Sequence, residues 1–390
     1  MIIPKLALRN LLGAGIRTWL NVVVLSFSFV AIIWTQGYLE GMNQQMAQAK
    51  IQSEYAGGQY WQELYDPFDP LSLLDAHAPV PDVLQKLVDQ GRAAPILVIQ
   101  ASIYPEGRMR SILLKGIPPE QDIIGLPSRF LESEEDIVPV LIGARMAKAI
   151  GFEVGDSFIV QWRDADGTFD AVDAEIVQIM TTSVPSIDSG QMWIPLEKLR
   201  TMAEMEGEAS LIVVARDSEL LPEAAGWEFK DLGFLLADIR AIIKSKSLGS
   251  SIMYVILLLL AMLAIFDTQV LSIFRRKKEM GTLMALGFTR LRVIRLFTFE
   301  GALNGILAAL VGSLYGIPLL GYAAKEGWAM PEATDTFGLA IGEKLFPVFG
   351  AGLVIGTTVL VLLVTTIVSY LPTRRIAKLK PTEALRGSST

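Results

Sequence analysis

Four long apolar segments stand out in the pattern of hydrophobic and polar positions along the 390-residue chain. They cover residues 19–38, 248–274, 296–322 and 346–371. Each segment is long enough to cross about 30 Å of hydrocarbon as an α-helix. Aromatic residues that favour the membrane interface lie near their ends, namely Trp19, Trp34, Tyr38, Tyr254, Tyr322 and Tyr370. The pattern therefore predicts an α-helical membrane protein with four transmembrane helices.

The first apolar segment follows an amphipathic N-terminal stretch, residues 1–18, that carries Lys5, Arg9 and Arg17. Basic residues ahead of an apolar run are also typical of a cleaved signal peptide. Here, however, the run is long, and the residues after it lack the small-residue pattern of a cleavage site. We therefore expect this segment to be retained as a membrane anchor.

Residues 39–247, between the first two apolar segments, carry short helical and strand patterns that predict an α+β domain. Helical spacing marks 81–90, part of 140–162, and 194–205, and strand patterns mark 96–116, the end of 140–162, 173–180 and 210–216. The sequence PEG at 105–107 divides 96–116 into two strands around a turn. From about residue 231, helical periodicity continues into the second apolar segment, which predicts a stalk helix.

The composition fits a membrane protein with a large aqueous portion. Hydrophobic residues make up 52% of the chain and charged residues 19%, with a mean hydropathy of +0.43. These values are too apolar for an ordinary soluble domain and too charged for a chain wholly embedded in lipid. The chain has no cysteine, which excludes disulfides and thiolate metal sites. Because its single histidine has no cluster of ligand residues around it, we expect no metal site.

Basic residues gather beside the ends of the apolar segments, although the net charge of the chain is −7. They lie in the N-terminal stretch, in the connector 275–295 and in the tail 372–390. Such residues favour the cytoplasmic side. We therefore expect both termini and the connector to be cytoplasmic, with 39–247 forming an acidic extracytoplasmic domain. Residues 323–345 then form a short external loop.

The connector contains a short amphipathic segment, EMGTLMALG at residues 279–287. Four of its side chains are apolar and available for docking: Met280, Leu283, Met284 and Leu286. A helix of about two turns is not stable alone in water. It therefore needs a partner surface, which is either another protein or the membrane. The remaining members of the segment are Glu279, Gly281, Ala285 and Gly287.

Other candidate residues lie in or beside the apolar segments. The third segment carries two small-residue pairs, Gly301 with Gly305 and Gly312 with Gly316, whose spacing lets helices approach closely, either within one chain or between two chains. Asp267 lies inside the second segment, where we favour a structural hydrogen bond over a functional role. The first segment is followed by a methionine-rich and aromatic run that either faces a lipid-like substrate or forms a domain core: Met42, Met46, Tyr60 and Trp61, with Tyr55, Tyr65 and Phe68.

Five motifs in this sequence resemble those of FtsX-like permeases. The sequence FRRKKEMGTLMALGFTRLRVIRLFTFEG at 274–301 resembles the family's central signature, and YLPTRRIAKLKPTEALR at 370–386 its closing pattern. The opening LALRNLLGAGIRTWL and two motifs of the external domain, VLIGARMAKAIGFEVGD and MWIPLEKLRTM, also agree. The size of the external domain and the lack of a fused ATPase are most similar to the LolC/LolE lipoprotein-releasing branch.

The resemblance implies a type VII ABC transporter permease with a MacB/LolC-like periplasmic domain, located in the bacterial inner membrane. A second permease chain, identical or paralogous, and a LolD-like cytosolic ATPase are then its partners, and lipoproteins and a periplasmic carrier are possible further ones. ATP and Mg²⁺ are expected in the ATPase, with no cofactor on this chain. The chain itself has no P-loop and no catalytic motif, so we expect no enzyme activity. No nucleic acid partner is expected.

The resemblance also implies a mechanism, mechanotransmission, in which ATP-driven closure moves the external domains and substrate need not cross the bilayer. In this family, segment 279–287 resembles the coupling helix that sits in a groove of the ATPase. Lipoprotein extraction from the outer leaflet is the activity that the LolC/LolE branch implies. The alternatives are a MacB-like efflux permease and an FtsX-like regulator of a cell-wall hydrolase that transports nothing.

Overall fold

The computed structural model describes residues 16–132, 137–182, 184–218, 221–241, 277–329 and 344–376, with isolated positions between 252 and 270. The chain divides into two compact units. The helical unit comprises Met1–Met42, Ile243–Trp328 and Leu345–Thr390, and the sheet unit comprises Asn43–Ile242 and Ala329–Lys344. Each unit is described separately below.

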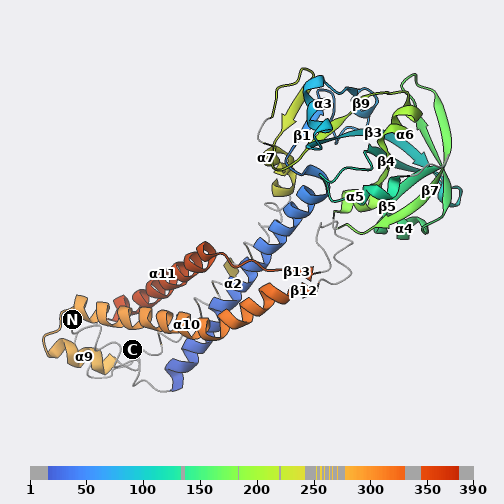
Figure 1. The fold of residues 1–390 in the computed structure, drawn as a ribbon. Coiled ribbons are helices and arrows are strands. Elements are labelled where there is room, and N and C mark those ends of the chain that lie inside the picture. Colours follow the sequence, from blue (N-terminus) through green and yellow to red (C-terminus); the bar gives the residue numbers. More distant parts are fainter. Residues whose placement is uncertain are drawn as a thin grey trace. The chain divides into compact units, whose positions relative to one another are not determined.

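Long apolar helices make up most of the helical unit (Figure 1). They are α2 (Ile16–Lys50), α10 (Arg290–Glu326) and α11 (Ala351–Ile376), with the short α9 (Lys277–Ala285) ahead of α10. By length and composition, the described residues include three candidate membrane spans, within Val22–Tyr55, Arg290–Glu326 and Ala351–Arg374. These overlap the first, third and fourth predicted transmembrane segments.

Several predictions fall outside the described residues. The second predicted transmembrane segment, 248–274, is described only at isolated positions, and Asp267 is not among them. The N-terminal residues up to 15 and the tail beyond 376 also lie outside them. The predicted stalk begins as α7 (Leu232–Leu235), is interrupted at Leu236 and resumes at 237–241, after which its continuation is not described.

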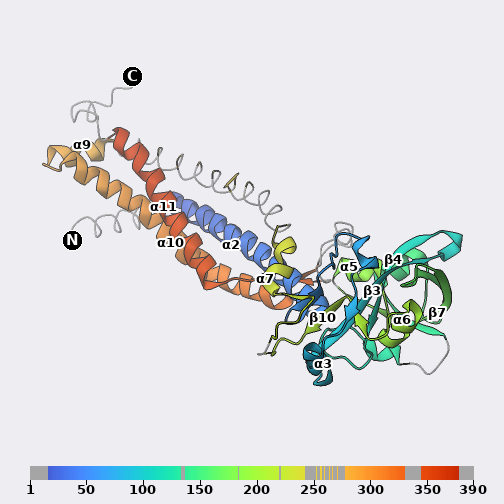
Figure 2. The ribbon, with the colours of Figure 1, turned by 90° about the horizontal axis from the view of Figure 1, so that it is seen from above.

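Helix α10 packs closely against both α2 and α11, as Figure 2 shows from above. The glycines of α10 lie at these contacts. A Cβ atom added to Gly305 would lie 2.7 Å from Oγ1 of Thr365 in α11, and one added to Gly316 would lie 2.9 Å from Cγ2 of Val30 in α2. Gly312 faces the same stretch of α2, and Gly301 is buried. In this chain the small-residue spacing therefore serves packing among its own helices.

Some polar side chains inside the helical unit make hydrogen bonds between its helices. The Thr357 hydroxyl lies 3.1 Å from Oε1 of Gln36, which joins α11 to α2. The hydroxyls of Ser26 and Tyr315, 3.3 Å apart, join α2 to α10. These contacts satisfy polar groups on helices that are otherwise apolar, where an unpaired hydroxyl would be costly.

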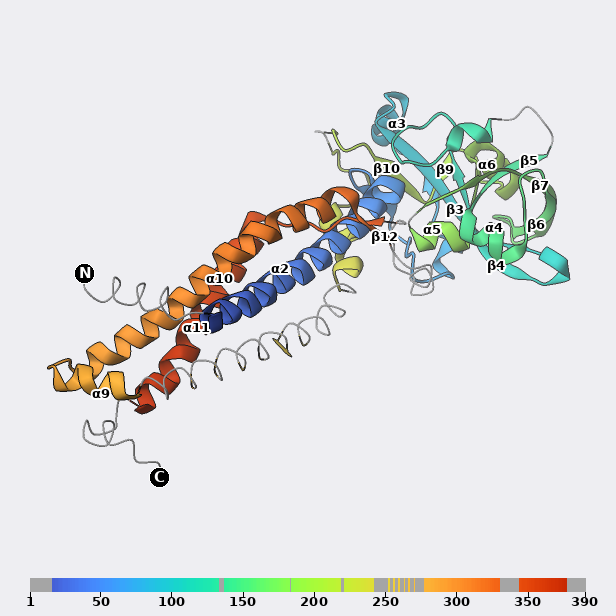
Figure 3. The ribbon, with the colours of Figure 1, turned by 90° about the horizontal axis from the view of Figure 1, so that it is seen from below.

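Among the residues that the structure describes, nine strands form the main sheet of the second unit, in the order β11-β1-β10-β3-β4-β8-β5-β7-β6. Their bounds are β1 (Gln59–Gln62), β3 (Ala93–Ile103), β4 (Arg110–Ile117), β5 (Val138–Gly143), β6 (Ser157–Arg163), β7 (Phe169–Met180), β8 (Gln191–Pro195), β10 (Leu211–Val214) and β11 (Trp227–Lys230). The end of β3 also pairs with β6, so the sheet closes into a barrel between these two strands (Figure 3). β3 is long enough to belong to the barrel and, through its first residues, to the open part with β10.

Short elements complete the sheet unit. The helices are α3 (Asp82–Asp89), α4 (Ala144–Ile150), α5 (Pro185–Gly190) and α6 (Leu196–Ala203), and α2 is followed directly by a π-helical turn, η1 (Ile51–Tyr55). The remaining turns and strands are η2 (Ser72–Leu74), η3 (Pro105–Gly107), η4 (Ser128–Leu131), β2 (Ala78–Pro79) and β9 (Glu208–Ala209), and β12 (Trp328–Ala329) and β13 (Lys344–Leu345) lie outside the main sheet.

The structure confirms the strands and helices predicted within residues 81–216. β3 and β4 flank the PEG turn, where Gly107 has a φ of +76°, a value that favours glycine. Helix α4 ends at Gly151, whose φ of +75° gives the left-handed cap expected there. Sequence patterns did not identify β1, β5, β8 or β11, which have four to six residues each. Strands this short carry too few positions for a clear alternation.

The core of the sheet unit lies on both faces of the sheet. Inside the barrel, residues such as Leu97, Ile103 and Leu114 are fully buried. In a second cluster, Trp193 and Leu141 of the barrel strands are equally buried and group with Ile117 of β4 and Val213 of β10. This second cluster forms the floor beneath the cavity described next.

Candidate functional site

A cavity of about 510 Å³ opens in the sheet unit. Its size lies in the range of small-molecule pockets, about 300–1,000 Å³. All lining residues belong to this unit and come from six segments: η1, β1 with the loop after it, the paired strands β4 and β8, β10 with neighbouring β3, β11, and the α7 region. The residues argued from below are Glu54, Trp61, Tyr65, Lys115, Trp193, Lys230 and Phe234.

A buried ion pair lies deep in the cavity. Lys115 of β4 is only 4% exposed, and its Nζ lies 3.7 Å from Oε1 of Glu54 in η1. Lys50, one helical turn before Glu54, pairs with the same carboxylate. Burial lowers the pKa of the Lys115 ammonium below its usual value, while the Glu54 carboxylate opposes the shift. In the cavity lining, the Lys115 ammonium group thus lies beside the Glu54 carboxylate, and Lys50, which is not part of the lining, pairs with the same carboxylate.

The Lys115 side chain also lies over an indole ring. β4 and β8 run parallel, and their register places Lys115 beside Trp193, with Nζ 5.0 Å from the ring centroid. Trp193 is fully buried, and its Nε1 has no hydrogen-bond partner among the residues that the structure describes. By contrast, Nε1 of the buried Trp162 donates to the Met202 carbonyl at 2.8 Å. Buried indole N–H groups usually have such a partner, so Trp193 stands out.

Aromatic rings form one wall of the cavity. Trp61 makes edge contacts with Tyr65 at 5.3 Å and with Phe234 at 5.8 Å between ring centroids. The Lys230 ammonium lies 4.6 Å from the Phe234 centroid and 5.7 Å from that of Trp61, and it pairs with Glu228. Burial raises the pKa of the Tyr65 hydroxyl, which therefore stays protonated in the physiological range. The wall is apolar apart from this hydroxyl and Lys230.

Hydrogen bonds fix the segment that carries Glu54. The Gln59 amide donates to the Glu54 carbonyl at 2.9 Å and accepts from Nε1 of Trp61 at 2.8 Å. The Gln52 carbonyl accepts from the Gly125 amide at 2.7 Å, in the loop that follows β4. These bonds attach η1 both to the aromatic wall and to that loop.

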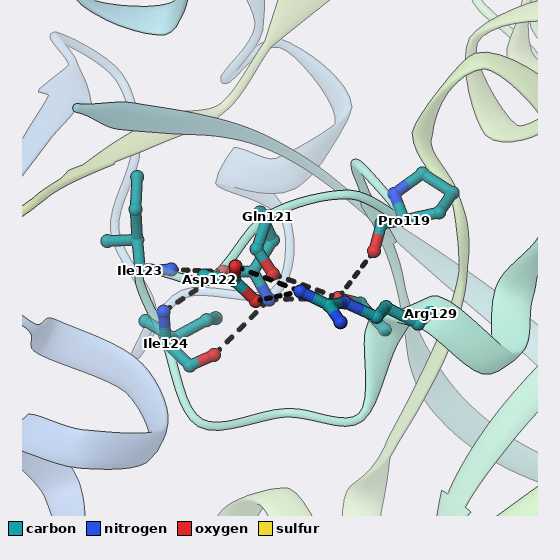
Figure 4. Close-up of polar contacts among 7 residues, drawn as sticks. Pro119, Gln121, Asp122, Ile123, Ile124 and Arg129 are labelled. Atoms are coloured by element: carbon teal, nitrogen blue, oxygen red, sulfur yellow. Dashed lines mark hydrogen bonds and ion pairs between the residues drawn. The ribbon is translucent and has the colours of Figure 1, made fainter. Parts of the chain in front are cut away.

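The loop after β4 is itself held by one side chain, Gln121 (Figure 4). Its Oε1 accepts from the amides of Ile123 at 2.9 Å and Ile124 at 3.0 Å, and its amide nitrogen donates to Oγ of Ser128 at 3.0 Å. Arg129 and Asp122 form an exposed ion pair at the outside of the same loop. The loop therefore presents a defined backbone to η1.

The predicted substrate-facing residues divide between core and cavity. Trp61 lines the cavity, and Tyr55, Tyr65 and Phe68 line it too. Tyr60, which points to the opposite face of β1, is 1% exposed and donates its hydroxyl to the Pro222 carbonyl at 2.9 Å, so it is a core residue. Met46 is buried on α2, and Met42 on the same helix is partly buried. Alternation along β1 separates the two roles of its aromatic residues.

Sequence reasoning missed the polar floor of this cavity. Lys115, Trp193 and Lys230 are far apart in the chain and are brought together only by strand pairing. One signal was present, because a lysine inside the apolar strand sequence ILLKG is unusual for a buried strand. Among the residues described, no group of three or more His, Cys, Asp or Glu side chains is placed to hold a metal ion.

The second candidate site is α9, which contains most of predicted segment 279–287. Met280 is 1% exposed and packs against Val293, Leu296 and Phe297 of α10. Leu283 and Met284 are partly buried in the same cluster. The expectation that all four apolar residues are free to dock is therefore wrong for Met280, because α10 of the same chain supplies its partner surface.

The opposite face of α9 remains exposed. Glu279 and Ala285 lie on it, and Leu286, just beyond its end, is 74% exposed. Gly281 is buried. Gly287 has a φ of +94° and ends the segment, after which the Thr289 hydroxyl accepts from the Arg292 amide at 3.4 Å and begins α10. The structure thus presents a short, anchored helix with a mixed polar and apolar outer face.

Comparison with known proteins agrees with this architecture. Residues 251–381, which include α9, α10 and α11, match the family described as FtsX-like permease C-terminal. This part of the chain therefore resembles an FtsX-like permease domain, and the described residues include apolar helices of membrane-spanning length.

Within that class, the sequence is similar to the LolC branch. It is 23% identical over 336 residues to the lipoprotein-releasing system transmembrane protein LolC of Neisseria meningitidis serogroup B, covering 75% of this chain and 77% of that one. LolC of Xylella fastidiosa strain 9a5c is 24% identical over 325 residues, with the same coverage of both chains. An uncharacterized ABC transporter permease of Methanocaldococcus jannaschii is 30% identical over 185 residues, covering 45% of this chain and 43% of its own.

Proposed function

We propose that this chain is the permease subunit of an ABC transporter that extracts lipoproteins from the outer leaflet of the bacterial inner membrane. ATP hydrolysis by a separate cytosolic ATPase drives movement of the sheet unit by mechanotransmission. The observation that carries the proposal is the extent of the similarity to LolC. The similarity covers 75% of the chain, whereas the family match covers only residues 251–381. The similarity to LolC therefore includes part of the sheet unit as well as the permease domain.

In this proposal, α9 is the element that receives force from the ATPase. Anchoring of Met280 on α10 supports that role, since a helix that is packed on a transmembrane helix passes on displacement better than a loose one. The outer face, with Glu279 and Leu286, then contacts the ATPase. Clustered basic residues beside the apolar segments support a cytoplasmic location for α9 and for both termini.

Release of lipidated cargo separates this proposal from its alternatives. The full chain is co-expressed with its ATPase and second permease chain, inserted in proteoliposomes with a fluorescently labelled lipoprotein, and supplied with ATP and a soluble acceptor. We expect ATP-dependent transfer of the label to the soluble fraction. The matched control omits ATP hydrolysis by using an inactive ATPase.

Two other outcomes overturn the lipoprotein assignment. ATPase association without lipoprotein release, but with activation of a cell-wall hydrolase, identifies an FtsX-like regulator. ATP-dependent export of a soluble compound with no lipoprotein release identifies a MacB-like efflux permease. If no ATPase co-purifies with the chain in several mild detergents, the assignment of α9 as a coupling helix is wrong.

A further inference from the structure

A groove of about 480 Å³ lies on the helical unit, between α10 and α11. Its apolar and hydroxyl-bearing lining includes Leu291, Ile294, Phe299 and Ala302 of α10 and Thr366 and Tyr370 of α11. Leu291 is 56% exposed, and Phe299 and Tyr370 are each 39% exposed. The Thr366 hydroxyl donates to the Leu362 carbonyl at 2.7 Å, so it needs no partner from outside the helix. Most of the groove therefore presents hydrocarbon surface.

The length of the groove matches one leaflet of a bilayer. Along α10, Leu291 and Ala302 are about 16 Å apart, at a rise of about 1.5 Å per residue. The hydrocarbon core of a bilayer is about 30 Å thick, so the acyl chains of one leaflet fill about 15 Å. The groove ends at Ala302 because one turn further the helices meet at Gly305, where an added Cβ would lie 2.7 Å from Thr365 Oγ1.

Two arginines, Arg295 and Arg374, form a basic end of this groove. Arg295 is exposed and belongs to the lining, and Arg374 is exposed on α11, one turn beyond Tyr370 and on the same face. The first residues of α10 and the last residues of α11 lie at the same end of the helical unit (Figure 2). Each Cα–Cβ bond leans toward the N-terminus of its own helix. The Arg295 side chain therefore leans toward this end, and that of Arg374 leans back toward the groove.

The basic end has no acidic counterpart in the groove. In the part of the chain that the structure describes, no carboxylate belongs to the lining or pairs with Arg295. Glu300, the nearest acidic residue along α10, is partly buried and lies outside the lining. The basic residues beside the apolar segments predict that this end of the helices is cytoplasmic. The groove thus combines a positive end at the membrane surface with an apolar interior.

An anionic phospholipid fits this combination. An arginine guanidinium binds phosphate oxygens through two parallel hydrogen bonds. Basic residues near the membrane surface are also attracted to anionic headgroups. A zwitterionic headgroup adds an ammonium group, and the described lining holds no carboxylate that could pair with it. The chemistry therefore favours a headgroup with a net negative charge.

We propose that this groove binds one anionic phospholipid of the surrounding bilayer, with its phosphate at Arg295 and Arg374 and one acyl chain along Phe299 and Ala302. Phosphatidylglycerol is the simplest common member of this ligand class. The site goes beyond the proposed transport function, because it depends neither on the cargo nor on the ATPase.

The test uses the full chain in phosphatidylcholine nanodiscs, without ATP, ATPase or lipoprotein. The probe is phosphatidylglycerol with a photoreactive diazirine in one acyl chain, and labelled peptides are mapped by mass spectrometry after irradiation. We expect saturable labelling of residues 291–302 and 366–374. A phosphatidylcholine probe with the same chains should label these residues at least about fivefold less, the factor that one basic residue near the surface supplies.

Arg295→Gln is the diagnostic variant, because it removes the positive charge of the lining and keeps a long polar side chain. We expect it to lower labelling by phosphatidylglycerol about fivefold and to leave labelling by phosphatidylcholine unchanged. Arg290→Gln is the matched control. Arg290 is exposed near the same end of α10, but it lies about 140° away from Arg295 around the helix. If attraction to the membrane surface alone brought the lipid, both variants would lower labelling equally, which would overturn the proposal.

A second pair of variants tests the groove without changing charge. Ala302→Phe places a ring at the inner end of the groove and should reduce labelling by phosphatidylglycerol. Ala351→Phe adds the same ring at an exposed position where α11 begins, outside the groove, and should not.

Three further results would overturn the proposal. The first is equal labelling by the two lipids, and the second is wild-type labelling in both Arg295→Gln and Ala302→Phe. The third is protection of the lining peptides from both probes together with cross-links to a second copy, which would identify the groove as a contact between chains. Since no transport is measured, each of these results leaves the proposed function standing.

Discussion

Lys115 of β4 lies beside Trp193 of β8, with its ammonium nitrogen 5.0 Å from the centroid of the indole ring and 3.7 Å from the Glu54 carboxylate. Lys115 thus contacts Trp193 of the neighbouring strand and Glu54 of η1, the π-helical turn that follows α2. Burying a charge is unfavourable unless it is paired. This contact therefore adds a buried ion pair to the hydrogen bonds that hold η1 against the sheet.

Removal of that charge should destabilise the sheet unit. In Lys115→Met, we expect the free energy of unfolding to fall by about 3 kcal/mol, because the Glu54 carboxylate loses one of its two buried partners. The measurement is thermal unfolding of the full chain, followed by circular dichroism. The control is Asp122→Asn, which breaks the exposed pair with Arg129 and should change nothing measurable. Equal melting temperatures for Lys115→Met and the wild type would contradict the structural role of the pair.

Titration of Lys115 should make the free energy of unfolding depend on pH in the alkaline range. The pKa of Lys115 is lowered in the folded chain relative to its ordinary value of 10.5. Between these two pKa values the unfolded chain binds more protons, so this residue makes the free energy of unfolding increase as pH rises. We expect the wild type to gain stability relative to Lys115→Met as pH rises through this window. A constant difference in melting temperature across the window would show that the ammonium titrates normally.

The exposed end of the α9 segment should be required for association with an ATPase. Leu286→Asp places a charge on an exposed side chain and should abolish co-purification of the ATPase while membrane insertion is unchanged. Ala285→Pro, which breaks the last turn of α9, should act similarly. Leu291→Asp, at another exposed leucine near the start of α10, is the matched control and should retain the ATPase. Normal co-purification with Leu286→Asp and Ala285→Pro would remove α9 from the coupling mechanism.

Met280 packs against α10 and should therefore determine how stably α9 is held there. Met280→Ala removes a buried side chain from the contact with Val293 and Leu296 and should weaken this packing by about 2–4 kcal/mol. Hydrogen exchange of the α9 amides should then become faster, while exchange in the sheet unit stays the same. Unchanged protection of α9 would mean that its position does not depend on α10.

The glycines of α10 provide a test of helix packing. Gly305→Val should displace α11, because its Cβ alone would meet Thr365 Oγ1 at 2.7 Å, and overpacking of this kind costs about 1–3 kcal/mol. Gly321→Val in the same helix is the control, since nothing lies within 4 Å of a Cβ there. The two variants are compared by the fraction that stays monodisperse after heating in detergent. If both behave alike, close approach at Gly305 is not required.

Local patterns predicted much of this structure because periodicity reports which face of an element is buried. Turn residues such as Gly107 and Gly151 marked where strands and helices end. The cavity could not be predicted in the same way, since Lys115, Trp193 and Phe234 meet only after strands distant in sequence have paired. The partner of Met280 was equally hidden, because an apolar helix face is compatible with any apolar surface and the sequence does not say which one lies nearest.

The pairing of β3 with β6 also affects whether the sheet unit can associate with other copies through a free strand edge. A strand edge with unpaired backbone groups is a template for aggregation. Because β6 returns to β3, the main sheet, among its described strands, is left with a single free edge at β11. That edge is only four residues long, and Glu228 and Lys230 alternate along it. Short length and charge are two common protections of an exposed edge, so the sheet resists joining edge to edge with another copy at high density in the membrane.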